Sequence, residues 1–397
     1  MARRIRLGVA GLGRAFTLML PTLAAHPAVE LVAAADPRRE ARERFVADFG
    51  AKAYAGVEEL CDDSNVEAVY VATPHQLHAR HAVLAAERGK HLLVEKPMAV
   101  SLDEAQSMVD AARAGGVHLV VGHSHSFDAP ILAARAIVES GELGRVRMIT
   151  ALNFTDFLYR PRRPEELDTA AGGGVVFSQA AHQVDIVRLL GGGLAKSVRA
   201  TTGAWDPDRA TEGAYSALLA FEDGAFASMT YSGYGHFDSD ELCGGIGETG
   251  FAKDASRYGT ARRSLGALGG GEEAAAKAAR NYGGAAEAKP PNAAPWHEHF
   301  GLIVVSCERG DVRPMPTSVI IYGDDAVRTV PLAKPAVPRA EVIDELAAAV
   351  FDGVPPLHDG AWGLATLEIC LAVLDSARGA REVVLTRQCR PRGIIPA

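Results

Sequence analysis

The sequence predicts an α/β protein with an N-terminal doubly wound parallel sheet followed by a C-terminal α+β domain that contains a large, mostly antiparallel sheet. Three observations indicate this. Short apolar runs alternate with helical patterns over roughly the first 125 residues. A glycine-rich turn follows the first of these runs, and later strands succeed one another without intervening helices. We expect the first domain over residues 1–126 and the second over residues 127–397.

The first domain is expected to consist of βαβ units. One predicted helix is Leu77–Glu87, and a second, Leu102–Ala114, begins at a capping box formed by Ser101 and Glu104. The predicted strands are Ile5–Ala10, Glu30–Ala35, Ala68–Ala72, His91–Glu95 and Val117–Val121.

The pattern changes after Phe127, where the second domain is expected to begin. Its predicted helices are Ala129–Glu139, a helix that follows glycines within Gly172–Leu190, Arg339–Val350 and Gly363–Ala377. Its predicted strands are Val146–Phe154, Lys196–Thr202, Ala214–Phe221, Phe226–Ser232 and Ser318–Tyr322. Residues 265–295 are rich in Ala, Gly and Pro, and we expect an insertion with at most one weak helix, either a mobile surface loop or an arm or lid.

The composition is that of an ordinary globular protein. Of 397 residues, 48% are hydrophobic and 23% are charged, and we find neither a signal peptide nor a long apolar run that would span a membrane. We therefore expect a cytoplasmic protein. The net charge of -8 disfavours a nucleic-acid partner. Five cysteines without CxxC spacing indicate neither a zinc knuckle nor a disulfide framework.

The segment GLGRAF, residues 11–16, is typical of a turn that binds a dinucleotide. Gly11 permits a tight turn, and Gly13 lets backbone amides approach a pyrophosphate at the helix N-terminus. Asp36 ends the next strand, where its carboxylate can bind the ribose hydroxyls. This context predicts a Rossmann domain that binds NAD. Arg38 and Arg39 leave NADP open, and a turn without a ligand is the alternative.

Three motifs in order resemble the glucose–fructose oxidoreductase, inositol dehydrogenase and MocA superfamily of NAD(P)-dependent oxidoreductases: VATPHQLH at 71–78, VEKPMAV at 94–100 and GGGVVFSQAAHQVDIVRLL at 172–190. The resemblance covers nearly the whole chain. It implies that Lys96 lies beside the nicotinamide and the substrate hydroxyl, that His182 points into the same pocket, and that Asp185 supports the helix. Ser178 departs from the family pattern, because relatives usually carry an aspartate there; Lys96 and His182 are therefore expected to carry more of the proton transfer.

A dehydrogenase needs such groups, because hydride loss from an alcohol carbon leaves a hydroxyl proton that a base must accept. Lysine is a poor base at its ordinary pKa of about 10.4, and a buried position beside the positively charged nicotinamide would lower that pKa. The alternatives are that Lys96 is a surface lysine before a proline and that His182 is a core histidine.

The expected site residues fall into three groups. The catalytic residues are Lys96 and His182. The cofactor-binding residues are Gly11, Gly13, Arg14, Ala15, Phe16, Asp36, Arg38, Thr73, Pro74, His78, Glu95, Lys96 and His123. The substrate-binding residues are His125, Arg160, Arg162, Arg163, Ser178, Gln179 and His182. Phe16 replaces the third glycine of the turn, which alters packing there and could bring its ring to the cofactor.

Arginines near the predicted catalytic helix indicate an anionic substrate. Arg160, Arg162 and Arg163 precede the glycine run, and guanidinium groups pair with carboxylates through two parallel hydrogen bonds. The alternative is that they only solvate a loop beside Glu165, Glu166 and Asp168. Several phrases, among them GLGRAFTLMLPT and GHSHSFDAP, resemble the phthalate 4,5-cis-dihydrodiol dehydrogenase subgroup, which implies oxidation of a carboxylated cyclic cis-diol.

Two other functions stay open at this point. One is a sugar or glycoside dehydrogenase, and the other is a redox sensor that binds the cofactor without catalysis. The many histidines between His75 and His125 invite a metal site, but nothing in their spacing demonstrates one, so we expect none and assign them to the pocket lining. We expect a homodimer or homotetramer formed through the second domain, with no membrane partner.

Overall fold

The computed structural model describes residues 3–392 except 270 and 288–293. The chain divides into two compact units. Unit 1 comprises Met1–His123, Ala274–Ala293 and Ala336–Leu364, and unit 2 comprises Ser124–Glu273, Ala294–Pro335 and Ala365–Ala397. The first division falls three residues before the boundary that we expected. Two later segments, expected in the second domain, join unit 1 instead, because they pack on its helices.

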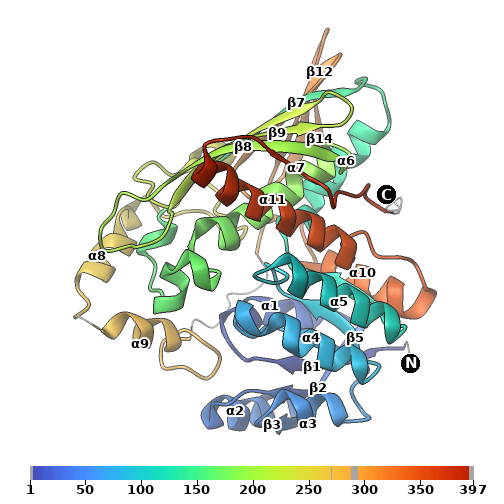
Figure 1. Cartoon of the computed structure of the whole chain (residues 1–397), viewed down its shortest axis with the longest axis vertical. Helices are drawn as coiled ribbons and strands as arrows, with labels where there is room; N and C mark the ends of the chain where they lie inside the picture. Colours follow the sequence, from blue (N-terminus) through green and yellow to red (C-terminus); the bar gives the residue numbers. More distant parts are fainter. Residues whose placement is uncertain (1–2, 270, 288–293, 393–397) are drawn as a thin grey trace. The chain divides into compact units, whose positions relative to one another are not determined.

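Unit 1 contains a six-stranded parallel sheet with the strand order β3-β2-β1-β4-β5-β6, as the doubly wound fold requires (Figure 1). The strand order reverses between β1 and β4, and ligands of such sheets bind beyond the carboxyl ends of the strands at that point. The strands are β1 (Ile5–Ala10), β2 (Val29–Ala35), β3 (Lys52–Tyr54), β4 (Ala68–Val71), β5 (His91–Val94) and β6 (Leu119–Val121).

The helices of unit 1 alternate with these strands, which confirms the predicted βαβ order. The strands β1 and β4 are almost wholly buried, as expected for a parallel sheet that is covered on both faces. The helices are α1 (Arg14–Ala25), α2 (Arg39–Phe49), α3 (Val57–Asp62), α4 (His78–Glu87), α5 (Leu102–Ala114) and the later α10 (Ala340–Asp352). The predicted capping box is present, because the Ser101 hydroxyl accepts a bond from the Glu104 amide.

Unit 2 contains a nine-stranded sheet with the order β14-β13-β12-β11-β7-β10-β9-β8-β15. Its neighbouring strands run antiparallel except for β7 and β10, which are parallel, so the predicted mostly antiparallel sheet is confirmed. The strands are β7 (Val146–Phe154), β8 (Ala195–Gly203), β9 (Ala214–Phe221), β10 (Phe226–Ser232), β11 (Leu302–Cys307), β12 (Gly310–Met315), β13 (Ser318–Gly323), β14 (Val327–Pro331) and β15 (Val383–Val384).

Two helices of unit 2 position the site. The helix α6 (Ala129–Glu139) follows the short turn η2 (His125–Phe127), and α7 (Ala181–Leu190) follows a π-helical turn, η6 (Val176–Ala180). Every residue of α7 is buried, since the helix packs against the sheet. Gly173, which precedes this helix, leaves no room for a side chain, because a Cβ there would lie 2.6 Å from the Glu165 carbonyl oxygen.

The insertion predicted at residues 265–295 contains one short helix, α9 (Glu272–Ala278), as expected, while α8 (Thr260–Gly266) ends at its start. Tyr282 anchors the segment after α9 in unit 1. The Tyr282 ring is fully buried, its hydroxyl donates to Asp48 at 2.6 Å, and its carbonyl accepts a bond from Arg38. The segment around Tyr282 therefore packs on unit 1, because this one aromatic residue supplies apolar surface that the composition of the insertion otherwise lacks. Residues 270 and 288–293 of this prediction lie outside the described residues.

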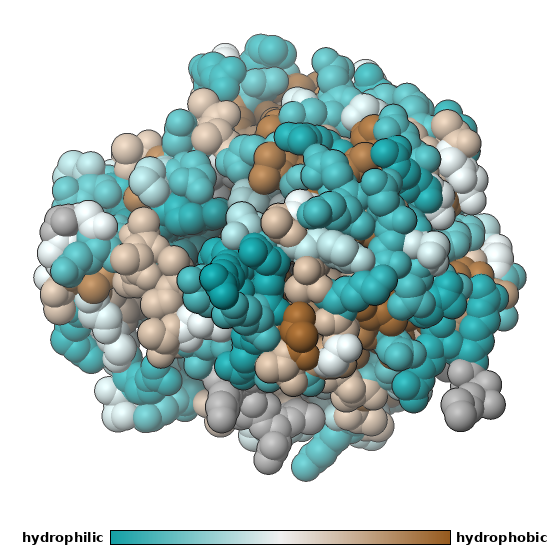
Figure 2. All heavy atoms as spheres, turned by 90° about the horizontal axis from the view of Figure 1, so that it is seen from below, coloured by the Kyte–Doolittle hydropathy of each residue, from teal (hydrophilic) through white to brown (hydrophobic). Residues whose placement is uncertain are grey.

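One helix, α11 (Gly360–Gly379), is long and apolar enough to cross a membrane by length and composition alone. Its most apolar window is 72% buried inside the structure, as in a core helix. On the face drawn in Figure 2, hydrophilic residues predominate, and the hydrophobic ones are scattered or in small groups. The apolar character of α11 is thus explained by its packing within the protein.

Candidate active site

The turn between β1 and α1 has the form that a dinucleotide requires. Gly11 has a φ of +94°, and a Cβ there would lie 2.8 Å from the carbonyl oxygen of Ala72. At Gly13 a Cβ would meet nothing within 4 Å, so that side of the turn is open to a phosphate. Arg14, Ala15 and Phe16 form the first turn of α1, where backbone amides point at an anion. These residues fit NAD.

Asp36 and Arg38 hold the end of this turn. The Asp36 carboxylate accepts bonds from the Leu12 amide at 2.8 Å and from the Arg38 guanidinium at 3.0 Å. Arg38 also donates to the Leu12 carbonyl at 2.7 Å. The arginine is thus tied to the carboxylate and to the turn. This arrangement keeps a carboxylate at the position that recognises ribose hydroxyls.

Two side chains that we predicted to touch the cofactor instead pack inside unit 1. The Phe16 ring is fully buried against Phe45 and Tyr282, with centroid separations of 6.2 and 5.1 Å, so only its backbone amide remains a candidate for phosphate binding. His78 is also fully buried, and its two ring nitrogens face the carbonyls of Pro97 and Thr73. His78 therefore joins two loops, which sequence spacing could not distinguish from ligand binding.

Lys96 follows β5, with Glu95 before it. Burial raises the pKa of Glu95, whereas the hydrogen bond from the Tyr70 hydroxyl, 2.5 Å long, and the charge of Lys96 oppose that rise. Thr73 and Pro74 follow β4, the neighbouring strand, and His123 follows β6. The predicted cofactor-binding residues of unit 1 therefore lie at the carboxyl ends of neighbouring strands, where a doubly wound sheet binds its ligand.

In unit 2, His182 belongs to a cluster with His125, Asp128 and Phe300, which we call the histidine cluster. The His182 ring lies 4.7 Å from that of His125 and 5.0 Å from that of Phe300, measured between centroids. His125 Nδ1 lies 2.7 Å from a carboxylate oxygen of Asp128. His182 and His125, two predicted site residues that are 57 positions apart in the sequence, thus lie in contact in the structure.

Asp185 holds α7 in place, as the resemblance implied. One carboxylate oxygen accepts a bond from the Ser126 hydroxyl at 2.5 Å, and the other accepts a bond from the Thr366 hydroxyl at 3.0 Å. The Ser178 hydroxyl donates to the Gly174 carbonyl, and Gln179 is buried in the same π-helical turn. Ser178 is therefore tied to its own backbone, which favours a structural role over direct proton transfer.

The three predicted arginines differ in their surroundings. Arg160 lies 3.1 Å from Asp156 and 4.0 Å from Glu248. The charges of Arg160 and Arg162 both act on Tyr231, whose ring stacks on Phe300 of the histidine cluster. The Arg162 guanidinium lies over the Phe157 ring, 3.5 Å from its centroid, and Arg163 pairs with Glu165 and Glu166. Arg160 and Arg162 are thus linked electrostatically to the cluster, and Arg163 matches the solvated-loop alternative.

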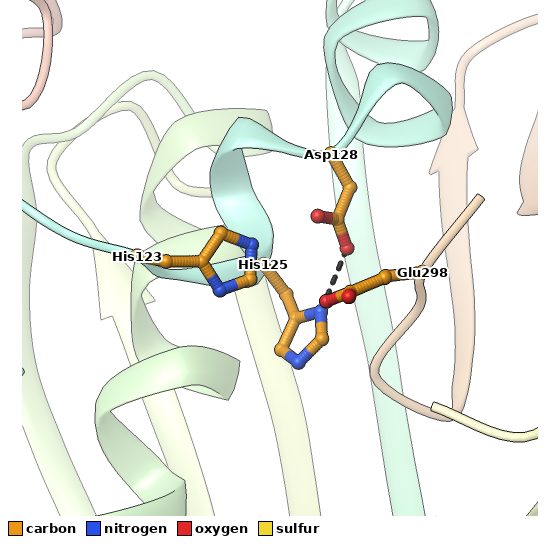
Figure 3. A group of neighbouring side chains, drawn as sticks. All are labelled: His123, His125, Asp128 and Glu298. Carbon is orange, nitrogen blue, oxygen red and sulfur yellow. Dashed lines mark hydrogen bonds and ion pairs between the residues drawn. The ribbon is translucent and has the colours of Figure 1, made fainter. Parts of the chain in front are cut away.

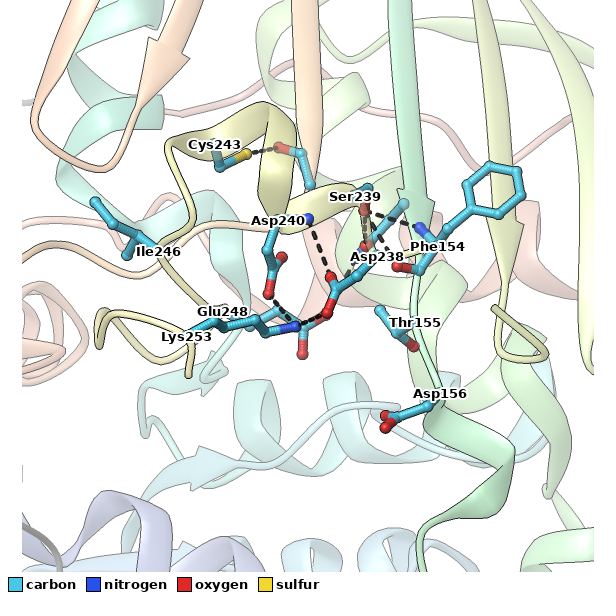
Figure 4. A network of polar contacts seen from close by, with 12 residues as sticks. Phe154, Thr155, Asp156, Asp238, Ser239, Asp240, Cys243, Ile246, Glu248 and Lys253 are labelled. Carbon is cyan, nitrogen blue, oxygen red and sulfur yellow. Dashed lines mark hydrogen bonds and ion pairs between the residues drawn. The ribbon is translucent and has the colours of Figure 1, made fainter. Parts of the chain in front are cut away.

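The sequence analysis missed a polar network at the end of β7, which we call the acid network: Asp238, Asp240, Glu248, Lys253 and His299. Figure 4 shows the first four of these residues. Lys253 lies 2.6 Å from Asp240, and Asn153 donates to Glu248 at 3.1 Å. Burial raises the pKa of Asp240 to about 6. Only the segment HEHF at 297–300, with two histidines and a glutamate before β11, could have signalled it.

Comparisons with known proteins agree with this geometry. Residues 5–123 match the oxidoreductase family with an NAD-binding Rossmann fold, and residues 131–252 match the GFO/IDH/MocA C-terminal domain. A 1-carboxy-3-chloro-3,4-dihydroxycyclohexa-1,5-diene dehydrogenase of Comamonas testosteroni is 47% identical over 377 residues, which cover 94% of this chain and 95% of that protein. The chain belongs to the Gfo/Idh/MocA family. It is an oxidoreductase with an NAD-binding domain.

Two other proteins similar to this chain extend the comparison. A solved structure from Bordetella bronchiseptica RB50 has a TM-score of 0.90 and 45% identity, covering 96% of this chain and 100% of that one. The levoglucosan dehydrogenase of Pseudarthrobacter phenanthrenivorans is 30% identical over 188 residues, which cover 46% of this chain and 47% of that protein. The proteins similar to this chain therefore include dehydrogenases named for different substrates.

Proposed function

We propose that this protein oxidises a carboxylated cyclic cis-diol with NAD, and that its substrate is a phthalate 4,5-cis-dihydrodiol, which becomes 4,5-dihydroxyphthalate. The observation that carries the proposal is the 47% identity, over almost the full length of both chains, to a dehydrogenase of a carboxylated dihydroxycyclohexadiene. Arg160, whose charge acts on Tyr231 beside Phe300 of the histidine cluster, supplies a group suited to a substrate carboxylate. Its activity would belong to aromatic degradation.

When bound, NAD would supply the acceptor for the hydride of the alcohol carbon. Lys96 accepts the hydroxyl proton as that hydride leaves, and the carbon–oxygen bond becomes a carbonyl, with His182 as partner or alternate base. The ring ketone then loses a proton from carbon and gains one on oxygen, which gives the catechol. Aromatisation makes the overall oxidation effectively irreversible. Lys96 and His182 are the two residues that this proposal assigns to proton transfer.

The test is formation of NADH, followed by absorbance, with phthalate cis-dihydrodiol, a monocarboxylated cyclohexadiene cis-diol and levoglucosan as parallel substrates. We expect turnover of the carboxylated diols and negligible turnover of the sugar. Turnover of sugars alone would refute the proposal and support the second candidate.

That second candidate is a sugar or glycoside dehydrogenase. The partial matches to levoglucosan dehydrogenase and to the 1,5-anhydro-D-fructose reductase of Ensifer adhaerens, 38% identical over 144 residues, favour it. Arg160 disfavours it, because a neutral sugar offers no carboxylate to pair with this guanidinium.

We further propose that the protein is a cytoplasmic homodimer or homotetramer that associates through the sheet of unit 2. Met148 and Phe226, paired in register on β7 and β10, are 36% and 42% exposed, and Leu218 on β9 is 51% exposed. An apolar sheet face of this kind is commonly covered by a second copy. Light scattering should show that the wild type is an oligomer and that Phe226→Glu dissociates it. Leu242→Glu, which lies outside the sheet, is the control and should leave the oligomer intact. A monomeric wild type would refute this proposal.

A further inference from the structure

His125, Asp128 and Glu298 form a group with the chemistry of a metal site (Figure 3). Each offers one ligand atom, and these atoms all lie within 4.8 Å of one another. The three come from two segments of unit 2: the turn before α6 and the stretch before β11. Because Glu298 is 170 positions after Asp128, no local spacing could reveal the group.

The orientation of Asp128 is the first argument. It is the N-cap residue of α6, where an aspartate ordinarily accepts a bond from a backbone amide of the first turn. Its side chain makes no such bond. Instead it is 95% buried and directed at His125, 2.7 Å from Nδ1. The carboxylate thus forgoes helix capping and faces the interior of the group.

Charge is the second argument. Asp128 is buried and Glu298 is partly exposed, and two carboxylates that share one site repel each other, so a neighbouring cation favours the arrangement. A divalent ion compensates both negative charges. Imidazole and carboxylate together suit zinc and the neighbouring transition metals better than Mg²⁺ or Ca²⁺, which prefer oxygen ligands alone.

The distances are compatible with this chemistry. Ligand atoms that bind one tetrahedral zinc ion at about 2.0–2.1 Å lie about 3.3 Å from each other. The 2.7 Å separation between His125 Nδ1 and Asp128 would therefore open by about half an ångström, and the wider separations in the group would close. Side-chain rotations achieve movements of this size without a change in the backbone.

We propose that His125, Asp128 and Glu298 bind one divalent transition-metal ion, with Zn²⁺ as the favoured ion. Three protein ligands leave a coordination position for another oxygen. The His125 ring contacts the His182 ring, so this position belongs to the region of the proposed reaction. Resting on the proposed function, we further propose that a carboxylate or hydroxyl oxygen of the substrate occupies it. This replaces our expectation that these residues only line the pocket.

The test uses Co²⁺ as a spectroscopic substitute for Zn²⁺ in the full chain after treatment with a chelator. We expect saturable binding of about one ion per chain, measured by visible absorption and by elemental analysis. Glu298→Gln and Asp128→Asn preserve side-chain size and should weaken binding at least about tenfold. The matched control is His297→Gln: its imidazole is adjacent in sequence but bonds the Ala333 carbonyl, and binding should be unchanged.

Absence of saturable binding to the wild type, or wild-type affinity in both carboxylate variants, would overturn the metal site. Thermal unfolding of each variant without metal identifies any that fails to fold, and Glu298→Asp, which keeps the charge, should then retain part of the affinity. Phthalate serves as the probe for the open position. A shift of the Co²⁺ spectrum by phthalate supports substrate ligation, and an unchanged spectrum refutes it. Because no step requires turnover, failure of the proposed function would be seen separately in the NADH assay.

Discussion

The cofactor turn of unit 1 and the histidine cluster of unit 2 are assembled in opposite ways. The turn is made by neighbouring residues between β1 and α1, with Asp36 at the end of the next strand. The cluster takes His125 and Asp128 from one segment, His182 from α7 and Phe300 from the stretch before β11. A local motif can be recognised in a sequence, whereas a cluster of distant residues exists only after the sheet has formed.

The largest expected effect concerns the proton acceptor. Lys96→Ala should lower kcat by about 10²–10⁴-fold, because a positioned base contributes about that much, while NAD binding stays close to that of the wild type. Steady-state kinetics and calorimetric titration with NAD measure the two quantities. Nearly unchanged kcat would mean that unit 1 supplies only the cofactor site, and would also support the redox-sensor alternative.

The glycines of the turn should show the next largest effect, and they form a matched pair. Gly11→Ala puts a side chain at positive φ and against the Ala72 carbonyl, so it should lower the free energy of unfolding by about 1–3 kcal/mol and abolish NAD binding. Gly13→Ala has room for its Cβ and should weaken NAD binding with little loss of stability. Chemical denaturation and NAD titration separate the effects. Equal stability of the two variants would contradict this account of the turn.

The arginines of unit 2 should show a smaller effect, confined to one of them. Arg160→Ala should raise KM for a carboxylated diol about tenfold, because loss of one charge-assisted contact costs about 1.5–3 kcal/mol at most. Arg163→Ala, which breaks pairs with Glu165 and Glu166 on the loop, should leave KM unchanged. An equal rise for an uncharged analogue, or for both variants, would remove Arg160 from substrate recognition.

The smallest expected effect is the pH dependence contributed by the acid network. Burial raises the pKa of Asp240 to about 6 from its ordinary value of 3.8. The folded state therefore binds this proton more tightly than the unfolded state, so the stabilisation is complete below about pH 3.8 and is lost as pH rises through about 6. Asp240→Asn should remove most of that decline. Unfolding curves between pH 4 and 8 measure it, with Asp325→Asn on the exposed surface as the control. Parallel pH profiles for wild type and Asp240→Asn would contradict it.

Several predictions from the sequence depended on local patterns and were confirmed. The alternation of strands and helices predicted the doubly wound sheet, because each βαβ unit buries its own apolar strand. The order of three motifs indicated the oxidoreductase family, to which the chain belongs. The capping box at Ser101 was also readable, since its two residues are three positions apart.

Other predictions required the folded protein. Phe16 and His78 have residue types that bind cofactors, but whether such a ring is exposed or buried depends on Tyr282 and Pro97, which are far away in the sequence. The insertion packs on unit 1 through Tyr282, and its overall composition, rich in Ala, Gly and Pro, gave no indication that this one aromatic residue would be buried. Glu298 and the acid network carried no signal beyond the short HEHF segment.

By itself, the sequence determined the parallel sheet, the glycine turn, the family and the NAD-binding domain, because hydrophobic periodicity and turn geometry act over a few residues. The tertiary structure decided which arginines are linked to the histidine cluster, which rings pack in the core and which carboxylates meet His125. The physical reason is that side chains hundreds of positions apart become neighbours only when strands pair and helices pack, and burial and charge take their values from those neighbours.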